Sequence, residues 1–184
     1  MRTQRTSTVL LSSCFAVLFA GIVGFAAGES TLVDAAKRHD ATPVRGLIGK
    51  RANVNETSRD GSTALLWAAY HSDVAMTRAL ITAGANPNLA NKYGITPLLQ
   101  ASRTGADEVV QALLRAGADP ALAHTEGETP LMAAAFAGSV PTVKLLIEAN
   151  ADVNAVDSYQ KQTALMRAAA EGHADVIQAL LDAK

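Results

Sequence analysis

The histidines offer the widest chemistry in this sequence, because imidazole both binds metal ions and transfers protons near neutral pH. There are four of them, His39, His71, His124 and His173. None lies three or four residues from another, so no helix face presents a pair of ligands. The only cysteine, Cys14, allows neither a disulfide framework nor a cysteine-based zinc site within one chain. We therefore expect no metal and no cofactor.

The carboxylates give no clearer sign of catalysis. Glu126 and Glu128 flank Gly127 at a predicted loop tip, where a solvated turn explains them more simply than an acid–base pair. No motif points to a Ser-His-Asp site, and no glycine-rich phosphate loop follows a strand. The 16 basic and 17 acidic residues leave a formal net charge of −1, which provides no basic surface for nucleic acid. The sequence thus predicts a protein that is not an enzyme and has no nucleic-acid partner.

The chain that must position these residues repeats one short motif. Triplets of Thr-Ala-Leu or Thr-Pro-Leu recur at spacings of 33, 33 and 34 residues, beginning at Thr63, Thr96, Thr129 and Thr163. A second series, alanine followed by Asn or Asp, recurs every 33 residues, at Ala52, Ala85, Ala118 and Ala151. One step of 33 back from Thr63 reaches Ser30, which we align with the threonines. A fixed period over residues 30–184 predicts a solenoid.

Each period predicts two helices. The threonine is a good N-cap, and proline directly after it suits the first helical position. Glycine or asparagine can adopt the left-handed conformation that ends a helix. The first helix is expected to end at Gly105, Gly138 or Gly172, and the second at Gly84, Gly117 or Asn150. Because the chain is 49% hydrophobic but only 4% aromatic, we predict an all-α fold of closely packed helices.

These residues resemble the ankyrin repeat family. Segments 60–63, 113–119 and 171–173 are similar to its Asp-Gly-x-Thr, Leu-Leu-x-x-Gly-Ala-Asp and Gly-His motifs. The resemblance implies a solenoid of five helix-turn-helix units of about 33 residues. Their approximate bounds are 29–59, 60–92, 93–125, 126–159 and 160–184. It also implies loops that project to one side and a concave face that holds another protein.

Departures from the motif concern mainly the two ends. The first unit has His39 and Arg51 where most units have glycine, and its charged residues suit an N-terminal cap. Ser72 replaces glycine in the second unit, and the fifth has one extra residue within 158–162. The last helix reaches Lys184 without a Gly-Ala-Asp turn. We expect either missing repeats of a longer array, or an apolar end face covered by a partner or by self-association.

Residues 1–28 have the three-part pattern of a secretory signal peptide. A positively charged start precedes an apolar run over residues 9–23, and small residues allow cleavage after Ala26 or Gly28. The run continues beyond Cys14, which disfavours lipidation there. An uncleaved signal anchor is the alternative, because the uncharged stretch is long enough to span a bilayer. We predict an exported protein, periplasmic or secreted, with no membrane span after signal cleavage.

Loop tips and exposed positions of the first helices form the predicted binding surface. The only tryptophan and all three tyrosines fall there, and Trp, Tyr and Arg are the residues that most often anchor interfaces. Trp67 and Phe136 could instead cover neighbouring helices. We predict a non-catalytic scaffold for an unidentified protein partner, with these candidate residues: Arg59, Trp67, Tyr70, His71, Lys92, Tyr93, Gln100, Arg103, Glu126, Phe136, Tyr159, Arg167 and Glu171.

Two alternative functions remain open. His39 and His71 occupy neighbouring sites in successive units, so they could approach each other and form, with Trp67 and Tyr70, a small-molecule or metal-responsive binding module. The chain could also be the recognition part of a longer, truncated protein. His173 fills the family's Gly-His position, where the resemblance implies a structural role.

Overall fold

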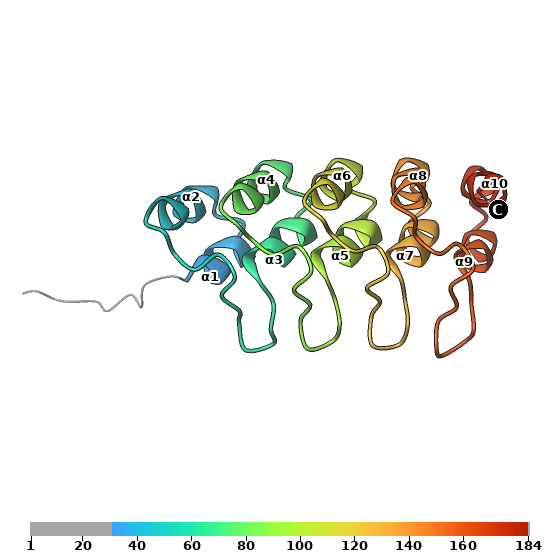
Figure 1. Cartoon of the computed structure of the whole chain (residues 1–184), viewed down its shortest axis with the longest axis horizontal. Helices are drawn as coiled ribbons and strands as arrows, with labels where there is room; N and C mark the ends of the chain where they lie inside the picture. Colours follow the sequence, from blue (N-terminus) through green and yellow to red (C-terminus); the bar gives the residue numbers. More distant parts are fainter. Residues whose placement is uncertain (1–30, 184) are drawn as a thin grey trace, which may run out of the picture.

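The computed structural model describes residues 31–183, so the predicted signal segment 1–28 lies outside the described residues. Within them the chain forms ten α-helices (Figure 1). The helices are α1 Leu32–Lys37, α2 Ala41–Gly49, α3 Ala64–Tyr70, α4 Val74–Thr82, α5 Pro97–Thr104, α6 Asp107–Arg115, α7 Pro130–Ala137, α8 Val140–Glu148, α9 Ala164–Ala170 and α10 Ala174–Asp182. The all-α prediction is confirmed for this part of the chain, where the only strand-like pairing is an isolated bridge between Thr57 and Thr63.

The odd-numbered helices begin at the repeated threonine. In each of them a threonine hydroxyl accepts a hydrogen bond from the backbone N–H three residues later. These N-caps are Thr31, Thr63, Thr96, Thr129 and Thr163. The alignment of Ser30 with Thr63 is therefore wrong by one residue, because Thr31 is the residue whose hydroxyl caps α1, accepting from Asp34 at 3.1 Å.

Left-handed backbone ends the helices at the predicted positions. The six residues expected to adopt it all have positive φ: Gly84, Gly105, Gly117, Gly138, Asn150 and Gly172. His39, Arg51 and Ser72 keep the same backbone path, with φ of 61°, 59° and 54°. A side chain in this conformation costs about 1–2 kcal/mol relative to glycine. The departures from the motif therefore preserve its geometry at the expense of local strain.

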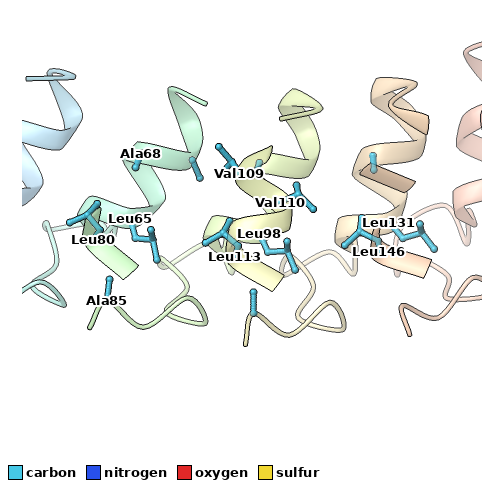
Figure 2. Close-up of a cluster of buried hydrophobic side chains, with 14 of the residues drawn as sticks. Leu65, Ala68, Leu80, Ala85, Leu98, Val109, Val110, Leu113, Leu131 and Leu146 are labelled. Atoms are coloured by element: carbon cyan, nitrogen blue, oxygen red, sulfur yellow. The ribbon is translucent and has the colours of Figure 1, made fainter. Parts of the chain in front are cut away.

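The helices stack in two rows. The odd-numbered helices contact one another in one row and the even-numbered helices in the other, and the long loops project beyond the odd-numbered row (Figure 1). Leucines from both rows form one continuous core (Figure 2). They include Leu65, Leu80, Leu98, Leu113, Leu131 and Leu146, each essentially inaccessible to water. Buried alanines such as Ala68, Ala101 and Ala134 let the helices approach closely.

Each long loop rests on the next one along the solenoid. The backbone N–H of Lys92 donates to the carbonyl of Asp60 at 2.9 Å, and that of Ser158 donates to Glu126 at 2.9 Å. Gly127 is required in its loop, because a Cβ there would lie 2.9 Å from the backbone nitrogen of Ser158. The loops therefore form a contiguous layer beside the odd-numbered helices.

Asparagine side chains join neighbouring helix pairs outside the core. The amide of Asn55 donates to the carbonyl of Gly84 at 3.2 Å, and its oxygen accepts from the backbone N–H of Asn86 at 2.8 Å. Asn88 makes the same two contacts one period later, at 3.0 and 2.8 Å. The next position in the series is Ala121, which has no amide to offer. This bridge is therefore missing between the third and fourth helix pairs.

The end of the solenoid formed by α9 and α10 exposes apolar side chains. Met166 and Leu181 are 55% and 46% exposed, whereas Met132, the counterpart of Met166 one period earlier, is fully buried. The apolar end face expected from the sequence is thus present in the described residues. No helix within residues 31–183 is long and apolar enough to cross a bilayer.

Candidate partner-binding face

The candidate residues gather on the side formed by the ends of the odd-numbered helices and the loop tips, which we call the inner face. Two ion pairs show that these helix ends point toward the loops, because Arg103 of α5 contacts Glu128 and Arg167 of α9 contacts Asp157. Tyr70 and Phe136 occupy the position of Arg103 in α3 and α7, 33 residues before and after it. They therefore belong to the same side.

Exposed aromatic side chains are concentrated on the inner face. Within residues 31–183 they are Tyr70, Tyr93, Phe136 and Tyr159, which are 53%, 59%, 55% and 81% exposed. All four belong to the predicted set. Phe136 therefore does not cover a neighbouring helix, the alternative that the sequence allowed for it. Aromatic rings on a rigid surface supply large contact areas at small entropic cost.

Trp67 lies deeper than the other aromatic residues. It is half-buried and packs against the core, so the alternative role of covering neighbouring helices applies to this residue. Its ring centroid lies 5.5 Å from that of Tyr70, in an edge-to-face arrangement. The ammonium of Lys37 lies 5.3 Å from the same centroid, a cation–π distance. The indole Nε1 is buried without a hydrogen-bond partner among the described residues.

His39 and His71 approach each other, as their positions in the repeat predict. Their rings stack with centroids 4.6 Å apart and planes within 10°. Nε2 of His39 lies 2.9 Å from Oδ2 of Asp73, and Nε2 of His71 donates to the carbonyl of Lys37 at 3.0 Å. Burial raises the pKa of Asp73, but the backbone N–H of Met76 and the neighbouring His39 lower it by more. The pKa of Asp73 therefore lies below its ordinary value. No group of three or more His, Cys, Asp or Glu side chains within residues 31–183 is placed to hold a metal ion.

Glu128 is the centre of an ion-pair network that the sequence did not indicate. Its Oε2 accepts from Nε of Arg103 at 3.0 Å and from Nη2 of the same residue, and its Oε1 accepts from Nη1 of Arg167 at 2.8 Å. Its side chain is only 17% exposed. The prediction that Glu128 belongs to a solvated turn is therefore wrong, because guanidinium groups from α5 and α9 enclose it. Glu126 is exposed, as that interpretation requires.

Asp157 extends this network into the last long loop. Its Oδ2 accepts from Nη2 of Arg167 at 3.1 Å, and the residue is 3% exposed. Burial raises the pKa of Asp157, but the backbone N–H of Gln160 and the Arg167 guanidinium lower it by more. The pKa of Asp157 therefore lies below its ordinary value. The network lines a pocket of about 230 Å³ that Tyr159 also borders. Its charged groups are already paired, so the network fixes the positions of the residues around it.

A larger pocket, of about 530 Å³, lies between α1, the first long loop and Trp67. Its charged lining residues are Asp34, Lys37, Glu56, Arg59 and Asp60. The hydroxyls of Ser58 and Ser62 donate to the Asp60 carboxylate and lower its pKa to about 2. This carboxylate is therefore ionised at any physiological pH.

His173 packs in the turn between α9 and α10. Its Nε2 donates to the carbonyl of Phe136 at 3.0 Å, and its ring lies over Gly138, where a Cβ would come within 2.7 Å of the imidazole. These contacts confirm the structural role implied by the Gly-His motif.

Three candidates, Lys92, Gln100 and Glu171, stand apart from these clusters, whereas Arg59 lines the pocket beside Trp67. Arg59, Lys92 and Glu171 are exposed and Gln100 is half-buried. Sequence reasoning missed the contributions of Lys37, Asp73, Glu128 and Asp157. The period could have identified Asp73, which follows His39 by 34 residues, but Glu128 is 25 and 39 residues from its two arginines. Those separations are not multiples of the period.

The two rows of helices and the layer of loops define a helical repeat solenoid with a preformed inner face. The family model described as ankyrin repeats (3 copies) matches residues 32–124 and 116–184. The chain therefore belongs to the ankyrin repeat family, whose repeats are generally protein–protein interaction modules. The comparison with curated proteins gave no match.

Proposed function

We propose that this protein is an exported, non-catalytic scaffold of five ankyrin repeat units that binds a protein partner across its inner face and loop tips. The partner meets a preorganised surface, because the Glu128 network holds α5, α9 and the loops in fixed positions. Little ordering entropy then opposes association. Aromatic side chains supply contact area, and the exposed Arg59 and Lys92 supply charge at the loop tips.

The concentration of exposed aromatic side chains on the inner face supports this proposal most strongly. Single exposed apolar residues are normal on protein surfaces, but aromatic residues gathered on one side are typical of interfaces. Tyr70, Tyr93, Phe136 and Tyr159 alternate between odd-numbered helices and loops. A partner that lies along the solenoid would contact all four.

Capture of the partner from an extract of the native host tests this proposal. We expect tagged protein to retain a specific partner, and the Tyr70→Ser/Phe136→Ser variant to lose it while circular dichroism shows an unchanged helical fold. The matched control is Val156→Ser/Met166→Ser, which removes two exposed apolar side chains outside the predicted set and should retain the partner. If both variants captured the partner equally well, the inner face would not be the binding site.

The apolar segment within residues 1–28 supports the exported part of the proposal. Fractionation of the host followed by mass measurement of the mature chain tests it. We expect a chain in the periplasm or medium that begins at residue 27 or 29, after cleavage behind Ala26 or Gly28. A full-length chain in the membrane fraction would favour the uncleaved anchor, and a full-length chain in the cytoplasm would contradict export.

A further inference from the structure

We propose that the 530 Å³ pocket beside Trp67 receives an arginine side chain of the protein partner, whose guanidinium replaces the Lys37 ammonium over the indole ring. This inference rests on the proposed function, because the bound partner supplies the arginine. It names the chemistry by which one end of the inner face selects that partner.

The floor of the pocket already holds a cation. The Lys37 ammonium lies 5.3 Å from the Trp67 centroid, so this ring face attracts positive charge in the free protein. Tryptophan is the best aromatic partner for a cation, and arginine is the more frequent guest because its planar guanidinium also stacks on the ring. Lys37 has a flexible side chain on the exposed surface of α1, so it can move aside.

The walls of the pocket favour a cation over an anion. Three carboxylates, from Asp34, Glu56 and Asp60, face two cations, from Lys37 and Arg59, which leaves a net charge of −1. One oxygen of Glu56 accepts from the backbone N–H of Val33 at 3.3 Å, and its second oxygen remains available for a guest. A guanidinium offers five donors, enough to contact two carboxylates at once.

The second pocket of the inner face offers a guest cation fewer carboxylates without an arginine partner. Its carboxylates from Glu128 and Asp157 are already paired with Arg103 and Arg167. Glu126, at the exposed loop tip, is the remaining carboxylate of that lining. The pocket beside Trp67 instead joins the indole ring to three carboxylates, from Asp34, Glu56 and Asp60, which lie outside the ion pairs of Arg38, Arg103 and Arg167. Its volume also falls within the range of about 300–1,000 Å³ typical of ligand pockets.

Intrinsic fluorescence provides a direct test, because Trp67 is the only tryptophan in the chain. The probe is N-acetyl-arginine amide, titrated at constant ionic strength into the full chain. The controls are N-acetyl-citrulline amide, which has nearly the same shape without the charge, and N-acetyl-glutamate amide, which carries the opposite charge. We expect a saturable change in Trp67 emission with the arginine probe alone.

Two variants test whether Lys37 and the guest compete. Lys37→Met removes the resident cation but keeps the length of the side chain, and should tighten binding of the arginine probe about threefold or more. Asp34→Asn removes one wall charge and should weaken it. A response to the glutamate probe alone, a response to none of the probes, or weaker arginine binding by Lys37→Met would each overturn the proposal.

The partner experiment separates this inference from the proposed function. If the arginine probe fails to bind, while partner capture needs Tyr70 and Phe136 but is unaffected by Lys37→Met and Asp34→Asn, the scaffold function stands and the arginine pocket does not. If the probe binds as expected but no partner is captured, the pocket stands and the scaffold function fails.

Discussion

At the scale of single residues, two left-handed glycines have the same backbone but different surroundings. Gly138 and Gly172 both have φ of +74°, yet a Cβ on Gly138 would lie 2.7 Å from the His173 ring, and one on Gly172 would meet nothing within 4 Å. We predict that Gly172→Ala lowers the free energy of unfolding by about 1–2 kcal/mol. Gly138→Ala should cost about 1 kcal/mol more, because His173 must rotate away and lose its hydrogen bond to Phe136.

Urea unfolding of the two glycine variants measures this difference. Repeating the comparison in a His173→Ala background provides the control, since the ring that the new methyl group meets is then absent. The two alanine substitutions should then cost the same. A gap that persisted without the imidazole would show that His173 is not its cause.

The ionisation of Asp60 makes the stability of the folded chain depend on pH. Hydrogen bonds from Ser58 and Ser62 lower its pKa from 3.8 to about 2 in the folded chain. Because the folded pKa is the lower one, its contribution is fully present above the unfolded pKa and is lost as the pH falls from about 4 to 2. We predict that Asp60→Asn unfolds at lower urea concentration than the wild type at neutral pH but loses less of its remaining stability over that acid range. Urea midpoints measured along the pH series check this, and parallel curves for the two proteins would contradict it.

At the scale of elements, the missing asparagine bridge can be restored. Asn55 and Asn88 each donate to one backbone carbonyl and accept from one backbone N–H of the next helix pair, whereas Ala121 cannot. We predict that Ala121→Asn raises the free energy of unfolding by about 1 kcal/mol and that Asn88→Ala lowers it by a similar amount. Asn154→Ala is the matched control, because no helix pair follows it in the described residues, and it should stay within about 0.5 kcal/mol. Thermal unfolding of the three variants distinguishes these outcomes.

The helices were predictable because their signals are local and repeated. A threonine N-cap and a left-handed glycine act over a few residues, and the period places them again in each helix pair. The same locality explains the error at Ser30, because serine and threonine are both good caps and α1 is one residue shorter than α3. The stacking of His39 on His71 was also predictable, since residues about one period apart lie side by side.

The ion-pair network of the candidate site was not predictable in this way. Glu128 meets Arg103 and Arg167 across 25 and 39 residues, through the shape of a loop rather than through the period. By contrast, the exposure of Tyr70 and Phe136 followed from positions that vary between units and so escape the demands of packing. Sequence therefore located the aromatic residues of the inner face but not the polar residues that hold it rigid.

At the scale of the whole molecule, each helix pair depends on its neighbours. The inner pairs are covered on both sides, whereas α9 and α10 are covered on one side within the described residues, which leaves Met166 and Leu181 exposed. In such a solenoid, stability is approximately a sum of the stability of each unit and of each interface. The contacts of Arg167 with Glu128 and Asp157 then matter more than their number suggests, because they attach the last pair from its covered side.

Replacing each arginine of the network with methionine tests this view of the solenoid. Arg167→Met leaves the Asp157 carboxylate buried without its guanidinium, and should cost roughly 1–3 kcal/mol, felt mainly in α9 and α10. Arg103→Met leaves Glu128 paired with Arg167, and should cost under about 1 kcal/mol. Hydrogen exchange followed helix by helix should show faster exchange in α9 and α10 of Arg167→Met, with α3 to α6 unchanged. If protection fell equally from α3 to α10, the array would open as one cooperative unit, and Arg167 would stabilise the whole solenoid rather than its last interface.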